Sequence, residues 1–187
     1  REGALRSTIK RMSKKFAVDG GHMEILLAGD RLGVCLNAYQ AVYAASWKVP
    51  EPYPEFMPAL INACSQKGWL RLGIAWMGNQ AVAAQVWIVA NGKASIYKLA
   101  YREDAREHAP GTLLTAHMMQ YVMTVDKVTE IDYLIGDDSY KKSWMNSRRE
   151  RWGIVAYAPN SVSGCIGLAQ EVLRRMVKRL RTKPTNR

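Results

Sequence analysis

The chain has 187 residues, of which 48% are hydrophobic and 9% aromatic. This composition excludes a disordered chain and is sufficient for one domain with a substantial core. The sequence has no apolar run of eighteen residues and no signal-peptide pattern, so we expect a soluble, cytoplasmic protein.

The net charge of +11 comes from the two ends of the chain. Residues 1–15 and 170–187 together carry thirteen basic and two acidic residues, whereas residues 16–169 carry fourteen of each. Such ends suit an RNA, an anionic membrane surface or an acidic partner. They are equally typical of solvated helix faces beside a frayed tail.

Cysteine and histidine spacing gives no sign of a metal site. The three cysteines are isolated in sequence, at Cys35, Cys64 and Cys165. This arrangement predicts neither a disulfide framework nor a zinc site and favours a reducing compartment. The histidines also lack the spacing of metal ligands, so we expect no metal, and we expect His117 to be a core residue of its helix.

The first third of the chain combines helices with one strand. Apolar periodicity and glycine or proline breaks predict a basic helix over 1–15, a strand over 22–28, a helix over 31–48 and a helix over 55–66. Three prolines between positions 50 and 54 force an extended connection before the last helix.

Three β-rich stretches follow, over 69–77, 81–90 and 94–101. Gly78-Asn79 and Asn91-Gly92 separate them and are typical of tight hairpin turns. These stretches therefore predict an antiparallel meander.

The stretch after the meander carries the strongest site signal. The strand over 94–101 leads through a polar loop to Pro110 and Gly111, which open an apolar helix over 111–125. A helix N-terminus has unpaired N–H groups and a positive dipole end, so this loop predicts an anion site. The same Pro-Gly pair is also typical of an ordinary helix start.

The last quarter predicts a strand over 130–134, a short helix bearing Tyr140, Lys141 and Trp144, and a strand over 153–158. A final helix begins near Ser163, with a basic face and an apolar face that we expect to be buried. The apolar residues are Ile166, Ala169, Val172, Leu173, Met176, Val177 and Leu180. The element order as a whole predicts an α+β fold.

Two motifs resemble those of a known family. Residues 106–111, Arg-Glu-His-Ala-Pro-Gly, resemble the Arg/Gln-x-x-Gly-x-Gly/Ala loop of GNAT acyltransferases, with Ala109 at the fourth position. A second set resembles the GNAT branch linked to cellulose and exopolysaccharide biosynthesis, related to the FemAB-like transferases. Its motifs are Pro-Gly-x-Leu-Leu and Asp-Phe/Tyr-x-x-Gly-Asp-x-x-Tyr-Lys-x-x-Trp. The matching residues are Pro110, Gly111, Leu113, Leu114, Asp132, Tyr133, Gly136, Asp137, Tyr140, Lys141 and Trp144.

This resemblance, which covers about residues 1–158, implies a GNAT-like mixed, mostly antiparallel central sheet flanked by helices. The domain would span 16–160, with a basic flanking helix at 1–15 and a basic amphipathic helix and tail at 161–187. FemAB-like proteins pair two such lobes, so the start at Arg1 fits the C-terminal lobe of a longer protein, and a homodimer is the other arrangement.

The resemblance also implies an acyl-CoA-dependent N- or O-acyltransferase acting on a small-molecule or glycan-precursor acceptor of the cell envelope or an exopolysaccharide. One alternative is an aminoacyl-tRNA donor, served by Arg148, Arg149 and Arg151 and by the basic ends. Another is a non-catalytic scaffold that binds an anionic membrane or partner through its basic helices. The loop at Gly111 favours the CoA donor.

For the co-substrate, acetyl-CoA or another acyl-CoA, the resemblance implies two groups of residues. The backbone of Leu99, Ala100 and Tyr101 would align the pantetheine arm. The pyrophosphate would face the loop and helix start, at Arg106, Pro110, Gly111, Thr112 and Leu113.

Acyl transfer needs a base for the acceptor, donors for the developing oxyanion and a proton for the leaving thiolate. The candidates are Asp132 as base, Lys141 beside the reacting carbonyl and Tyr140 as proton donor. Asp132 is equally suited to capping the next loop, and Lys141 to a solvent-facing position.

On the acceptor side the candidates are Trp47, Asp137 and Trp144. Asp137 is also suited to the N-cap of the short helix, and Trp144 to a core or pocket wall.

Overall fold

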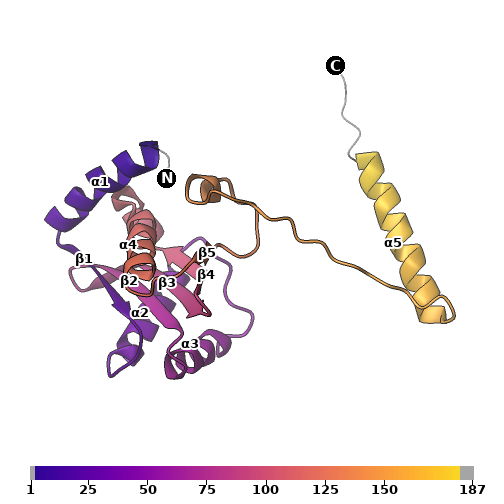
Figure 1. Cartoon of the computed structure of the whole chain (residues 1–187), viewed down its shortest axis with the longest axis horizontal. Coiled ribbons are helices and arrows are strands. Elements are labelled where there is room, and N and C mark those ends of the chain that lie inside the picture. Colours follow the sequence, from indigo (N-terminus) through magenta and orange to yellow (C-terminus); the bar gives the residue numbers. More distant parts are fainter. Residues whose placement is uncertain (1–2, 182–187) are drawn as a thin grey trace, which may run out of the picture. The chain divides into compact units, whose positions relative to one another are not determined.

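Figure 1 shows the structure, a computed structural model that describes residues 3–181, with side chains through Val177. The chain forms two compact units, Arg1–Asn146 and Ser147–Arg187.

The first unit is built on one five-stranded sheet with the strand order β1-β2-β3-β4-β5. The strands are β1 (Gly21–Leu26), β2 (Leu70–Met77), β3 (Gln80–Ala90), β4 (Lys93–Tyr101) and β5 (Glu130–Asp132). The first four pair antiparallel, and β5 pairs parallel to β4. The predicted mixed, mostly antiparallel sheet is therefore confirmed.

Helices cover both faces of the sheet (Figure 1). On one face lie α1 (Gly3–Val18) and α4 (Pro110–Thr124), which share a core cluster that includes Phe16, Trp87 and Leu114. On the other face lie α2 (Leu32–Ala44) and α3 (Phe56–Gln66). Two short 3₁₀ helices, η1 (Glu103–His108) and η2 (Ser139–Ser143), lie in the loops around β5 and α4.

Of the elements that end earlier than the sequence predicts, two end beside a local side-chain hydrogen bond. The helix predicted over 31–48 ends at Ala44, where the Ser46 hydroxyl donates to the Tyr43 carbonyl at 2.7 Å. The strand predicted over 130–134 ends at Asp132, because its carboxylate accepts the Leu134 N–H at 2.7 Å and Leu134 turns the chain with φ +59°.

Close packing of α4 on the sheet depends on a missing side chain at Gly73 in β2. A Cβ atom there would lie 2.6 Å from Met118 Sδ of α4 and 3.2 Å from Leu114 Cδ1. Glycine therefore sets how closely the helix approaches the strand.

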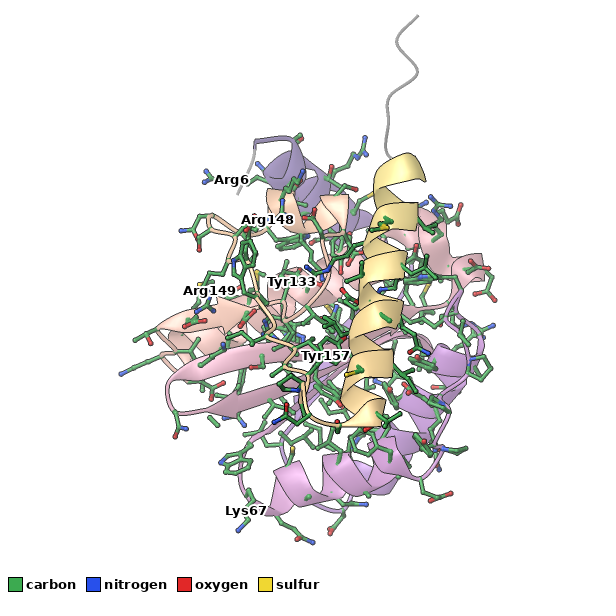
Figure 2. The ribbon with its side chains drawn as sticks, turned by 90° about the vertical axis from the view of Figure 1, so that its right-hand side faces the viewer. Arg6, Lys67, Tyr133, Arg148, Arg149 and Tyr157 are labelled. Carbon is green, nitrogen blue, oxygen red and sulfur yellow. The ribbon has the colours of Figure 1, made fainter. Side chains whose placement is uncertain are left out.

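In the second unit the predicted strand over 153–158 is wrong. These residues have no regular structure, and Ile154 is 97% exposed. A strand needs a hydrogen-bonded neighbour, and the described residues of this unit offer no other strand. Tyr157 instead lies beside α5 (Val162–Arg181), where its ring fills the space next to Gly167 (Figure 2).

Helix α5 is amphipathic as predicted, and its own unit does not cover its apolar face. Within this unit Ile166, Leu173 and Met176 are each more than half exposed. The apolar stripe has the helical period yet meets no covering layer among the described residues of its own unit. The predicted Leu180 lies outside the residues whose side chains are described. None of the described helices combines the length and apolar character that a membrane span requires.

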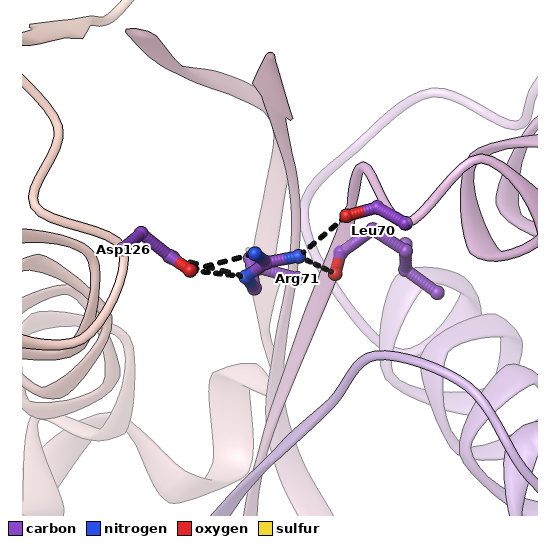
Figure 3. Close-up of polar contacts among 4 residues, drawn as sticks. Leu70, Arg71 and Asp126 are labelled. Atoms are coloured by element: carbon purple, nitrogen blue, oxygen red, sulfur yellow. Dashed lines mark hydrogen bonds and ion pairs between the residues drawn. The ribbon is translucent and has the colours of Figure 1, made fainter. Parts of the chain in front are cut away.

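A buried ion pair ties the end of α4 to the sheet (Figure 3). Arg71 of β2 meets Asp126, just after α4, with an Nη2–Oδ1 distance of 2.6 Å, and each side chain is 9% exposed. The guanidinium also donates to the carbonyls of Gly68 and Leu70. The arginine is thus satisfied on all sides, which makes its burial tolerable.

We expect Asp126→Ala to lower the free energy of unfolding by about 3 kcal/mol, because it leaves a buried guanidinium without its counter-charge. Urea unfolding followed by circular dichroism measures the change. The control is Asp104→Ala, which removes the exposed partner of Arg102 and should leave the midpoint nearly unchanged. Equal effects of the two variants would contradict this account.

Candidate functional site

The site is centred on the place where β4 and β5 part. Their parallel pairing covers Lys93–Ser95 and Glu130–Asp132 alone, whereas β4 continues to Tyr101. A bulge at Tyr97 interrupts the β3–β4 register, in which Trp87 pairs with Ile96 and Val86 with Lys98. In the described chain, β4 beyond Ser95 thus has a sheet partner on one side and an open edge on the other.

The N-terminus of α4 lies next to the end of that edge. Ala109, the N-cap, has a left-handed backbone (φ 49°, ψ 41°) and makes no side-chain cap within the described structure. Pro110 has no N–H, and the Leu113 N–H donates to the Ala109 carbonyl at 3.1 Å. The N–H groups of Gly111 and Thr112 are therefore the ones left for an anion.

An aromatic pair connects this helix start to β4. A Cβ atom on Gly111 would lie 3.0 Å from Cδ1 of Tyr101, so a side chain there would crowd the ring. The Tyr101 ring in turn packs on Trp47, with ring centroids 4.6 Å apart. The strand end, the helix start and the segment after α2 meet at this ring.

A buried polar network centred on Gln85 of β3 positions the first turn of α4. Gln85, 1% exposed, donates through Nε2 to the Gly111 carbonyl at 3.1 Å and to Thr115 Oγ1 at 2.7 Å. Its Oε1 accepts the Trp87 Nε1–H at 2.8 Å, and Thr115 donates to the Gly111 carbonyl. Sequence reasoning missed this residue, although a single glutamine in the apolar run Ala81–Ala90 is a usable signal.

The candidate base Asp132 lies where the strands part, as predicted, and its carboxylate has two roles already. Oδ2 forms an ion pair with Lys93 at 2.6 Å, and Oδ1 caps the following loop through Leu134. The capping role considered from sequence is therefore present.

Lys141 closes the loop that follows β5 and is not solvent-facing, since its side chain is 14% exposed. Its ammonium donates to the carbonyls of Ile135 at 2.8 Å and Gly136 at 3.3 Å, and it lies 3.1 Å from Asp138 Oδ2. It also sits 5.8 Å from the centroid of the buried Tyr133 ring. These contacts hold one positive charge at a fixed place beside the end of β5.

Tyr140 packs edge-on against Tyr133, with ring centroids 5.9 Å apart, and is 44% exposed. Burial and the nearby Asp138 carboxylate raise the pKa of Tyr140 above its ordinary value. The phenol therefore holds its proton at neutral pH, as a proton donor must.

The remaining predicted residues are more peripheral. Asp137 is exposed and is not the N-cap of η2, which is Asp138. Trp144 is half-buried against the core cluster of α1 and α4. Arg106 is exposed on η1, beside the helix start.

The histidine prediction is corrected. His117 is exposed on α4, at the border of the buried face that contains Leu114 and Met118. No group of three or more histidine, cysteine or acidic side chains is placed to hold a metal ion in the described part of the chain.

The sequence of residues 3–142 matches the model of the acetyltransferase (GNAT) domain. The chain belongs to the GNAT acetyltransferase family. It is accordingly an acyltransferase, in a family whose members use acetyl-CoA as co-substrate. A comparison with curated proteins finds no match.

Solved structures show the same fold at low sequence identity. An aminoglycoside acetyltransferase, meta-AAC0020, from an uncultured soil metagenomic sample is 17% identical, with 75% of this chain and 97% of that chain covered and a TM-score of 0.52. It has been solved with trehalose and with sisomicin. Glucosamine-6-phosphate N-acetyltransferase from Arabidopsis thaliana is 9% identical, with 72% and 97% covered and a TM-score of 0.51. The GNAT fold is thus shared across very different sequences.

We expect Gln85→Leu to lower the free energy of unfolding by about 2 kcal/mol, because the buried Trp87 N–H loses its acceptor and the Gly111 carbonyl loses one of its two side-chain donors. The same variant should weaken acetyl-CoA binding, since the first turn of α4 loses its anchor. Urea unfolding and calorimetric titration measure the two effects. Gln80→Leu, at the exposed start of the same strand, is the control. A stable Gln85→Leu variant with normal acetyl-CoA affinity would contradict the anchoring role.

Proposed function

We propose that this GNAT domain transfers an acyl group from acetyl-CoA, or another acyl-CoA, to an amine or hydroxyl of a small-molecule acceptor. The observation that carries the proposal is the meeting of two open backbone sites at Tyr101 and Gly111. One is the unpaired edge of β4 beyond Ser95, and the other is the uncapped N-terminus of α4.

The residues present fit an acyl-CoA. The N–H groups of Gly111 and Thr112, with the exposed Arg106 guanidinium, would hold the pyrophosphate. The β4 edge at Leu99, Ala100 and Tyr101 would pair with the pantetheine arm. The co-substrate supplies the acyl group as an activated thioester.

Three side chains at the parting of β4 and β5 are proposed for the chemistry. Asp132 would accept the acceptor's proton, and the raised pKa of the Tyr140 phenol keeps a proton ready for the departing thiolate. Lys141 would stabilise developing negative charge, and its three oxygen partners fix its position. Trp47, Asp137 and Trp144 are proposed to contact the acceptor.

For the acceptor we propose a sugar of the cell envelope or an exopolysaccharide precursor, handled by a FemAB-like branch of the family. The motif residues from Asp132 to Trp144 support this assignment. The soil enzyme's complexes with trehalose and sisomicin, and the Arabidopsis enzyme's named substrate, support a carbohydrate class.

We further propose a cytoplasmic setting and a catalytic domain over 16–160, with basic segments at 1–15 and 161–187. The three cysteines, all described, are free thiols, as suits a reducing compartment. A second GNAT lobe or a second copy of the chain is the proposed partner.

The first test is calorimetric titration of the chain with acetyl-CoA and longer acyl-CoAs. We expect saturable binding that Gly111→Trp abolishes, because the indole would enter the space between Tyr101 and the helix start. The matched control is Gly33→Trp, since Gly33 is exposed on α2 and a Cβ there meets nothing within 4 Å.

No binding by the unaltered chain would overturn the acyl-CoA proposal. Binding of aminoacyl-tRNA in its place would support the tRNA donor. Binding of anionic vesicles alone would support the scaffold role, for which the apolar face of α5, uncovered within its own unit, and the ten basic residues of Ser147–Arg187 are the supporting features.

Tyr140→Phe should lower kcat by about a hundredfold and leave KM for acetyl-CoA nearly unchanged, because it removes the proton donor without touching the helix start. Release of free CoA, measured with an acceptor found in a screen of sugars and aminosugars, gives both constants. The control is Tyr53→Phe, at a 76% exposed tyrosine. An unchanged kcat would remove Tyr140 from the mechanism.

A further inference from the structure

A cluster of aromatic and charged side chains lies where α2 and the segment after it cover β4. Lys98 of β4 forms a 2.7 Å ion pair with Glu51, and its ammonium lies 5.7 Å from the Tyr43 ring centroid. The Tyr43 hydroxyl donates to the Val49 carbonyl at 3.4 Å. We call this the acceptor-side cluster; its members are Tyr39, Tyr43, Lys48, Glu51, Tyr97 and Lys98.

The cluster contains a buried hydroxyl group that lacks a hydrogen-bond partner in the described chain. Tyr39 is 2% exposed, yet its hydroxyl finds no hydrogen-bond partner in the described chain. Its ring packs 5.9 Å from that of Tyr43. Burial, and then the Glu51 carboxylate and the neighbouring hydroxyls of Tyr43 and Tyr97, raise the pKa of Tyr39 far above its ordinary value. The phenol is therefore a neutral donor, and an unpaired buried donor is costly unless a bound molecule satisfies it.

Lys48 adds a positive charge that no carboxylate matches. The backbone on either side is held, by the packing of Trp47 on Tyr101 and by the Tyr43 bond to Val49. The Lys48 ammonium makes no ion pair with any described residue, whereas Lys98 is paired with Glu51.

The pKa of Lys48 also reflects the charged groups around it. Burial, and then the ammonium groups of Lys98 and Lys141, lower the pKa of Lys48, while Asp138 and Glu51 oppose this change. With Lys48 itself, the charged groups behind this shift are three ammonium groups and two carboxylates, and the Lys48 ammonium lies 5.4 Å from the centroid of the Trp47 ring. One more negative charge would balance the group.

The position of the cluster connects it to the reaction. Tyr97 and Lys98 lie on the part of β4 beyond its pairing with β5, and Trp47 contacts Tyr101, which packs on Gly111. A molecule held by the cluster would lie beside the open edge of β4 that is proposed for the pantetheine arm.

We propose that the acceptor-side cluster binds an anionic group, a carboxylate or a phosphate, carried by the sugar acceptor. This inference rests on the proposed acyltransferase function. Lys48 supplies the unmatched charge, Lys98 turns part of its hydrogen bonding from Glu51 to the ligand, and the Tyr39 hydroxyl donates to a ligand oxygen. The cluster selects against cationic acceptors, because Lys48 would repel them.

The test is calorimetric titration of the acetyl-CoA-saturated chain with four probes: glucose 6-phosphate, glucuronate, glucose and the cationic sisomicin. We expect an anionic sugar to bind about tenfold or more tightly than glucose, the gain typical of a charge-assisted hydrogen bond. The phosphate and carboxylate arms identify which anion the cluster prefers. Binding of sisomicin or glucose as tight as that of both anions would overturn the proposal, and so would no binding of either anion.

Two variants locate the effect. Lys48→Gln should lower the affinity for the anionic probe about tenfold and leave the affinity for acetyl-CoA unchanged. Glu51→Gln should raise the affinity for the same probe, because it removes the carboxylate that pairs with Lys98. The same change would lower the affinity for a cationic acceptor. The control, Lys67→Gln, changes an exposed lysine just after α3 that is not a member of the cluster and is labelled in Figure 2.

Lys48→Arg is the second variant in case Lys48→Gln folds poorly. Because it keeps the positive charge, it should retain binding of the anionic probe. An unchanged anion affinity in Lys48→Gln would overturn the role of the cluster. Loss of acetyl-CoA binding by the unaltered chain would instead overturn the acyltransferase proposal, so the two failures are distinguishable.

Discussion

The position of α4 on the sheet is the constraint on which the rest of this structure depends. Two buried polar contacts hold the helix, the Gln85 network at its first turn and the Arg71–Asp126 pair just beyond its last. Apolar packing alone would let the helix slide, since dispersion and burial are not directional. Hydrogen bonds with fixed geometry set its register, and with it the place where the unpaired N–H groups of Gly111 and Thr112 lie.

The second constraint is the short pairing between β4 and β5. A parallel neighbour that stops after three residues leaves the rest of β4 without a partner on that side among the described residues. An open edge is normally a liability, yet next to a helix N-terminus it offers two kinds of backbone donor to one extended ligand. The turn after Asp132 maintains this gap, because the carboxylate bonds the Leu134 N–H and directs the chain away.

Much of the first unit follows from its sequence. Alternating apolar residues and the Asn91-Gly92 turn, both residues with positive φ, predict the meander, and the helical stripe of Leu5, Ile9 and Met12 predicts a packing face for α1, on which Ile9 and Met12 do contact the core. The errors have local causes. Ser46 and Asp132 end their elements through side-chain bonds that compete with the regular pattern. The position of His117 in the helical repeat does not by itself show whether a residue at the border of the buried face points to the core or to solvent.

The sequence by itself determined the family, the α+β order and the loop that leads to Pro110 and Gly111, because these depend on local patterning and on residues close in the chain. Only the tertiary structure decided which distant groups meet. Gln85 lies 26 residues from Gly111, and Arg71 lies 55 residues from Asp126. The unmatched charge at Lys48 is likewise a property of three segments brought together at β4. Spacing along the chain carries no record of such contacts, because they form between faces that only folding brings into register.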